Sequence, residues 1–186
     1  NKQLQILITS HSSHIVSECN FDDIIYLKRE GNEVIAKSFN SLKDKYGGDE
    51  QQGFKFVKQY LTINRSELFF ADKAICIEGD TERILMPMMM HKIDNKERSS
   101  GDTIPLLSQN ISIIEAGAHS HVFLPLFDFL GVKVLIITDI DAANKNDDGN
   151  YVKSNPRDAK YTSNASIKAF FKHTSLDTSG NQFREL

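Results

Sequence analysis

Short apolar runs alternate with amphipathic stretches in the second half of the chain. The elements expected there are strands at 73–77, 111–114 and 132–138 and helices at 81–92, 119–130 and 164–172. Strands separated by helices of this length favour parallel pairing with right-handed crossovers. We therefore expect an α/β fold, a Rossmann-like parallel sheet flanked by helices, in which the polar stretch 143–161 is a loop.

The first seventy residues have a different pattern, which predicts a small α+β unit. Its expected elements are a strand at 5–9, a helix at 12–18, a hairpin of 23–28 with 33–38, a polar loop at 41–53 and helices at 53–61 and 66–71. Gly31 and Asn32 are expected to form the turn of the hairpin. The chain is thus predicted to contain two domains, 1–70 and 71–186.

Composition indicates a globular protein of a reducing compartment. Of its 186 residues, 40% are apolar and 25% are charged. The two cysteines, Cys19 and Cys76, are far apart and lack the spacing of a metal site. Since no apolar run approaches the roughly 20 residues of a membrane span, we expect a cytoplasmic protein. The chain does not begin with methionine, and we expect it to be a piece of a longer protein.

Acidic residues follow all three strands predicted in the second half, with Glu115 after 111–114 and a pair of acids after each of the other two. Glu78 comes directly after 73–77 with Glu82 one helical turn further on, and Asp139 and Asp141 follow the run VKVLIIT. Ligand sites in such sheets form beyond the carboxyl ends of the strands, so the four carboxylates converge if the two strands are neighbours. Side chains two positions apart on an extended chain share a face, so both aspartates can point at one spot.

Four converging carboxylates need neutralisation, because they repel one another when ionised. Hard oxygen ligands without histidine or cysteine suit Mg²⁺ or Mn²⁺, and a pair of such ions commonly serves phosphoryl transfer. Taken singly, acids such as Asp80 and Glu115 are better explained as solvated loop residues or helix caps. His119 and His121 have no third ligand nearby and are expected to be cap or surface groups.

Sequence motifs in both parts of the chain resemble those of a known family. EGDTE, followed about 60 residues later by ITDID, each after an apolar strand, resembles a TOPRIM domain. QILITSHSSHIV resembles the last strand and switch-histidine loop of an ABC-type ATPase. An ATPase tail running into a TOPRIM domain is similar to the OLD (overcoming lysogenization defect) family of ATP-dependent nucleases, which includes phage-defence members.

This resemblance implies a metal-dependent DNA endonuclease that uses Mg²⁺ or Mn²⁺, with two ions hydrolysing the phosphodiester. Glu78 and Glu82 would be metal ligands, Glu78 would also be available for acid/base work, and the ligand set would be completed by Asp139 and Asp141. His11 would sense the ATP γ-phosphate in the full-length protein. Residues 1–70 would be the remnant of the ABC-type ATPase domain, through which the full-length protein is expected to form homo-oligomers.

The chain departs from the family pattern in two ways. It contains no G-x-x-x-x-G-K-[ST], so ATP hydrolysis by this fragment alone is not expected. OLD-type sites also use a lysine downstream of the aspartates, and Lys160, Lys168 and Lys172 are available without a clear match. We expect the fragment to be weakly active or inactive by itself.

A basic segment follows the second acidic motif. A DNA backbone that enters the site requires cations, and the candidates for this DNA binding are Lys153, Arg157, Lys160 and Lys168. Tyr151 and Tyr161 could stack on splayed bases. A solvated loop would account for the same composition.

Three other functions are compatible with parts of this pattern. A phosphatase of the haloacid dehalogenase type also has a strand ending in D-x-D, but Ala143 stands where that fold uses threonine or valine. A topoisomerase or primase module would share the TOPRIM ligands and leave TSHSSH unexplained. A regulatory module with a vestigial metal site would bind neither Mg²⁺ nor Mn²⁺.

Overall fold

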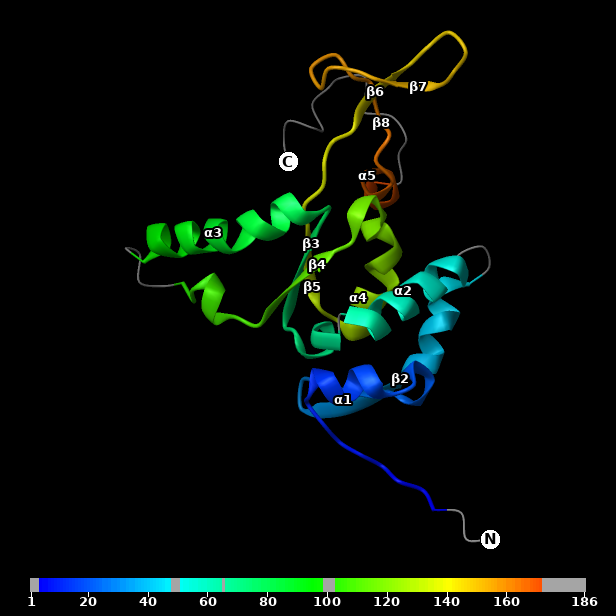
Figure 1. Cartoon of the computed structure of the whole chain (residues 1–186), viewed down its shortest axis with the longest axis vertical. Helices are drawn as coiled ribbons and strands as arrows, with labels where there is room; N and C mark the ends of the chain where they lie inside the picture. The colour runs from blue at the N-terminus through cyan, green and yellow to red at the C-terminus, as the bar shows by residue number, and fades with distance from the viewer. Residues whose placement is uncertain (1–3, 48–50, 65, 99–102, 172–186) are drawn as a thin grey trace.

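A three-stranded parallel sheet forms the centre of the molecule (Figure 1). The computed structural model describes residues 4–47, 51–64, 66–98 and 103–171. The sheet order is β4–β3–β5, with bounds β3 (Lys73–Ile77), β4 (Ile111–Glu115) and β5 (Lys133–Ile136). The crossovers contain α3 (Asp80–Glu97), the 3-10 helix η6 (Gly117–Phe123) and α4 (Leu124–Leu130). This confirms the predicted α/β class with a parallel sheet flanked by helices.

Strand β3 is buried on both faces because helices cover both sides of the sheet. Ala74 and Cys76 point into the larger, aromatic core beside α4, whereas Ile75 and Ile77 point into a smaller core with α3. Such a strand has a near-continuous apolar run, which is why its sequence signal was clear. Burial raises the pKa of the Cys76 thiol to about 12, so this thiol stays protonated at neutral pH.

The amino-terminal part forms a helix, a hairpin and further helices. Their bounds are α1 (Ser13–Glu18), β1 (Ile25–Glu30), β2 (Glu33–Ser38), the 3-10 helix η2 (Phe39–Tyr46), α2 (Gln51–Asn64) and the 3-10 helix η4 (Ser66–Phe70). The predicted helices and hairpin are confirmed, and the chain turns at Gly31, whose φ is 62°. The predicted loop at 41–53 is wrong in part, because Leu42 and Tyr46 are buried and hold η2 against the core.

The predicted strand at 5–9 is not formed. Residues 4–12 have no helix or strand, and Leu4, Ile6, Leu7 and Ile8 are exposed. A strand needs a neighbour for its backbone hydrogen bonds, and none of the strands that the structure describes pairs with this segment. The strand prediction for 5–9 is therefore wrong, and its apolar side chains are left exposed.

The polar stretch after Asp141, predicted as a loop, instead forms a small antiparallel sheet. Its strands are β6 (Ala142–Lys145), β7 (Tyr151–Lys153) and β8 (Tyr161–Thr162), in the order β7–β6–β8, and α5 (Ala165–Phe171) follows. Figure 1 shows this sheet extending away from the parallel sheet, with α5 between it and the body. We call β6, β7 and β8 the distal sheet.

One hydrophobic core joins residues from both predicted domains. Phe39 lies with its ring centroid 5.2 Å from that of Phe129, and Tyr60 lies 5.0 Å from Phe123. The Tyr60 hydroxyl also donates a 3.0 Å hydrogen bond to the carbonyl of Glu115, at the end of β4. The amino-terminal part therefore packs directly against the helices that cover the parallel sheet.

None of the helices in the described ranges has the length and apolar character needed to cross a membrane.

Candidate metal centre

Glu78 and the aspartate motif lie at the same edge of the parallel sheet. Strand β3 pairs with β5 in parallel register, with Cys76 opposite Ile136, and the Ile137 amide continues the ladder by donating to the Cys76 carbonyl at 2.8 Å. Glu78 is two residues beyond Cys76 and therefore lies beside the segment that carries Asp139. The condition set by the sequence, that these two strands be neighbours, is met.

Three donors hold the Glu78 carboxylate, and all of them reach the same oxygen. Glu78 Oε1 accepts hydrogen bonds from the Thr138 hydroxyl, from the Asp139 amide at 3.0 Å and from Asn164 Nδ2 at 3.2 Å. Within the described parts of the chain, Oε2 receives no hydrogen bond. The side chain is fixed through one oxygen, and the other is available to a ligand.

The predicted strand 132–138 is wrong at its end, because β5 stops at Ile136, and Asp139 and Asp141 lie in the turn that follows. Asp141 has the left-handed backbone angle φ 47°. Aspartate is among the residues that tolerate this conformation best. The turn ends regular pairing, so the period-two argument for a shared face does not apply here.

Asn164 links this turn to Glu78. Its Nδ2 lies 2.8 Å from Thr138 Oγ1, 3.0 Å from the Asp139 carbonyl and 3.4 Å from Asp141 Oδ2, besides its contact with Glu78. Asn164 is only 2% exposed. Its sequence signal was that of a cap for the last helix, and its contacts across 86 residues of chain had no local signal.

Glu82 follows on the first turn of α3. Its Oε2 accepts a 3.1 Å hydrogen bond from the Gly79 amide, which satisfies a donor at the helix start. Its carboxylate also lies where the positive end of the helix dipole stabilises a negative charge. Glu82 thus has a structural role alongside its predicted role as a ligand.

The four carboxylates lie near one edge but do not form a closed ligand set. Among the described residues, no three histidine, cysteine, aspartate or glutamate side chains are grouped closely enough to hold a metal ion. The donor chemistry nevertheless fits Mg²⁺ or Mn²⁺, since all four are hard carboxylate ligands and Glu78 Oε2 is available. The residues that would hold such an ion are Glu78, Glu82, Asp139 and Asp141.

Other acids near this edge are engaged in ion pairs. Arg83 lies 2.6 Å from Asp80 and 3.7 Å from Glu115. Its hydrogen bond to Asp80 raises the pKa of the guanidinium. These surface pairs agree with the interpretation of Asp80 and Glu115 as ordinary surface groups.

The predicted DNA-binding cations belong to the distal sheet and to α5. Lys153 lies on β7, Arg157 and Lys160 are exposed in the connection to β8, and Lys168 lies on α5. Lys168 Nζ lies 4.6 Å from the centre of the Tyr151 ring. Tyr151 in turn packs edge-on against Tyr161, with ring centroids 5.7 Å apart. Lys168, Tyr151 and Tyr161 therefore form a cluster that follows the acidic turn in the chain.

The three histidines considered from the sequence lie outside the hydrogen-bond network around Glu78. His11 is exposed in the irregular segment 4–12. His119 and His121 lie in η6 with their rings 6.1 Å apart, and His121 Nδ1 lies 3.5 Å from Ser166 Oγ.

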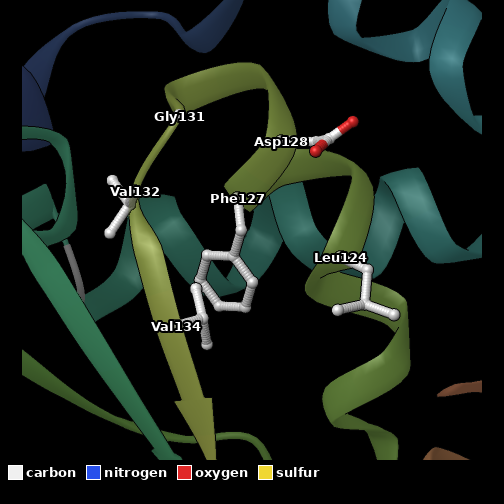
Figure 2. A pocket seen from close by; sticks show the side chains of 6 residues that line it. All are labelled: Leu124, Phe127, Asp128, Gly131, Val132 and Val134. Atoms are coloured by element: carbon white, nitrogen blue, oxygen red, sulfur yellow. The ribbon is translucent and has the colours of Figure 1, made fainter.

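An open hollow of about 490 Å³ lies between α4 and the beginning of β5 (Figure 2). It is lined by Leu124, Phe127, Asp128, Gly131, Val132 and Val134. Asp139 follows the other end of β5, so this hollow is separate from the carboxylates.

The structure has a parallel sheet with acidic residues beyond the carboxyl ends of its strands, and a family model of this kind of domain matches the same region. Residues 69–141 match the model described as "Overcoming lysogenization defect protein-like, TOPRIM domain". The match begins before β3 and ends at Asp141, so it contains all four predicted ligands. These residues form an OLD-like TOPRIM domain.

The chain is also a distant homologue of a curated protein, endonuclease GajA of Bacillus cereus (strain HuB5-5). The two are 31% identical over 181 residues, which cover 91% of this chain. The chain spans about a quarter (25%) of the length of that relative.

Proposed function

We propose that this chain is the nuclease part of an OLD-like ATP-dependent endonuclease and hydrolyses DNA phosphodiesters with Mg²⁺ or Mn²⁺. The observation that carries the proposal is the Glu78 carboxylate, held across two parallel strands against the turn that bears Asp139 and Asp141. The match to an OLD-like TOPRIM domain favours this activity over that of a phosphatase. The relative named as an endonuclease supports DNA as the substrate class.

In the proposed reaction, different residues of the chain would bind the metal and the DNA. Glu78, Glu82, Asp139 and Asp141 would hold the metal, and Glu78 would bind it through Oε2, because Oε1 is already hydrogen-bonded. Bound divalent ions supply charge stabilisation and lower the pKa of water. Lys153, Arg157, Lys160 and Lys168 would hold the DNA backbone on the distal side.

The remaining parts of the proposal concern the longer protein. Residues 1–70 would be the end of an ABC-type ATPase domain, with His11 sensing ATP and oligomers forming through that domain. The exposed apolar residues of segment 4–8 support this, as does the outer face of the hairpin, where Ile25, Leu27 and Val34 are 59%, 58% and 66% exposed. These surfaces would contact the rest of the protein, which would serve in phage defence.

The test of the proposal is cleavage of supercoiled plasmid in the presence of Mn²⁺ or Mg²⁺. We expect slow conversion to nicked or linear DNA by this chain, abolished by Glu78→Gln and by Asp139→Asn, since even partners outside a metal's ligand set contribute about 10- to 100-fold. Asp128→Asn is the matched control, because Asp128 has 84% of its side chain exposed and lies before β5 rather than after it. Cleavage retained by Glu78→Gln would contradict the proposal, and so would calorimetry that shows no uptake of Mn²⁺.

A further inference from the structure

The buried side-chain amide of Asn164 contacts both Glu78, which follows β3, and the turn that carries Asp139 and Asp141. An asparagine side chain has two N–H hydrogens, and Asn164 Nδ2 has four acceptors at 2.8–3.4 Å, three of which are Glu78 Oε1, the Asp139 carbonyl and Asp141 Oδ2. In the part of the chain that the structure describes, the Asp141 carboxylate has no other hydrogen-bond donor. Asn164 is therefore the hydrogen-bond link between the Asp141 carboxylate and Glu78 in the described part of the chain.

The other end of the same amide fixes α5. Asn164 Oδ1 accepts hydrogen bonds from the Ser166 amide at 2.9 Å and the Ile167 amide at 3.0 Å, which are otherwise unpaired at a helix start. Its backbone N–H donates to Thr162 Oγ1 at 3.0 Å. With both ends of the amide engaged, the side chain is held in one orientation.

Helix α5 is itself anchored by a separate contact. Ser166 Oγ donates to the Ala118 carbonyl at 3.1 Å and accepts from Ser120 Oγ at 2.7 Å. Ser120 and Ser166 are 2% and 3% exposed, so this contact is buried. It fixes α5 on η6 without touching a carboxylate.

We propose that Asn164 is a positioning residue that sets the mutual geometry of the Glu78 and Asp141 carboxylates and so prepares them for a divalent metal. The inference rests on the proposed function, because it takes these carboxylates as metal ligands. An asparagine side chain suits this position because its oxygen accepts hydrogen bonds from the backbone amides of α5 while its NH₂ group donates hydrogen bonds to carboxylates. Aspartate would cap the helix but would add another negative charge, and serine would cap it with too short a side chain.

The test compares Asn164→Ser with Ser166→Ala in the 186-residue chain. Serine retains a good helix cap but removes the amide donor, whereas Ser166→Ala weakens the docking of α5 and leaves the donor in place. Mn²⁺ affinity is measured by calorimetry and amide hydrogen exchange at Asp139 by NMR, both without DNA. We expect Asn164→Ser to bind Mn²⁺ about 10- to 100-fold more weakly and to exchange the Asp139 amide faster, and Ser166→Ala to retain wild-type affinity.

The outcomes separate the two proposals. Unchanged Mn²⁺ affinity and unchanged exchange in Asn164→Ser would overturn the positioning role while leaving the metal site intact. Equal losses in Asn164→Ser and Ser166→Ala would also overturn it, because docking of α5 would then explain both. A wild-type chain that takes up no Mn²⁺ would refute the metal site itself, and faster Asp139 exchange confined to Asn164→Ser would still establish that Asn164 orders the turn.

Discussion

At the scale of single residues, the backbone of Asp141 is the most constrained feature of the acidic turn. Among the non-glycine residues that the structure describes, it alone has a positive φ. Two hydrogen bonds hold it there, from the Ser163 amide to the Asp141 carbonyl at 2.9 Å and from the Thr162 hydroxyl to the Ile140 carbonyl. Backbone strain of this kind persists where the surroundings over-determine it, and it is commonly found at functional sites.

Replacing Asp141 should therefore separate backbone strain from charge. We expect Asp141→Val to lower the free energy of unfolding by about 1–3 kcal/mol, because a β-branched side chain fits the left-handed region poorly. Asp141→Asn should keep the stability, since asparagine tolerates this conformation, and should lose Mn²⁺ affinity. Urea unfolding followed by circular dichroism measures the first effect and calorimetry the second. Equal stability of the two variants would show that the turn is not strained.

The sequence predicted the acidic residues of this site but not its organisation. Glu78, Asp139 and Asp141 could be predicted to lie near one another, because acids that follow neighbouring parallel strands meet at the carboxyl edge of the sheet. Asn164 was not, because a residue that caps a helix and one that also holds distant carboxylates look the same in a local window. Thr138 was missed for a similar reason, since it was counted as the end of an apolar strand.

At the scale of elements, the distal sheet is the part that sequence patterns described least well. Its strands span only 142–145, 151–153 and 161–162, too short for a period-two pattern to stand out from a polar loop. Pairing across β6 stabilises them instead, together with the packing of Tyr151 on Tyr161. Non-local contacts of this kind cannot be read from composition.

We expect the cations on this sheet to act through the DNA backbone. Lys153→Ala and Arg157→Ala should each weaken the binding of duplex DNA to a similar extent for unrelated sequences. Each should also reduce the slope of log affinity against log salt by about 0.9, because one phosphate contact is lost. Fluorescence anisotropy over a series of salt concentrations measures both quantities. Lys43→Ala, on η2, is the control, and a slope identical in all three variants would exclude these two residues from the interface.

At the scale of the whole molecule, the aromatic core connects parts that the sequence had divided at residues 70 and 71. Phe39, fully buried, packs against Phe21 and Phe69 on its own side of that division and against Phe129 on the other. The order of strands and helices was predictable because each has a local period. The packing between the two parts was not, because it joins residues about 90 positions apart.

This shared core predicts that both parts unfold together. Phe39→Ala should lower the free energy of unfolding by about 3–5 kcal/mol and should speed hydrogen exchange of the β3 amides to match. Phe56→Ala, where the side chain is already 42% exposed, should have a smaller effect. Urea unfolding and NMR exchange are the measurements. Protected β3 amides in a destabilised Phe39→Ala variant would mean that the two parts fold independently.

The attachment of the distal sheet has a mechanical consequence. The chain leaves the body through Asp139 and Asp141, forms the three strands, and returns through Ser163 and Asn164. The acidic residues thus lie at the neck of a projecting arm, and a load on the arm is transmitted to the body at the neck. In the proposed nuclease, a substrate bound to the arm would therefore act directly on the spacing of the Glu78 and Asp141 carboxylates.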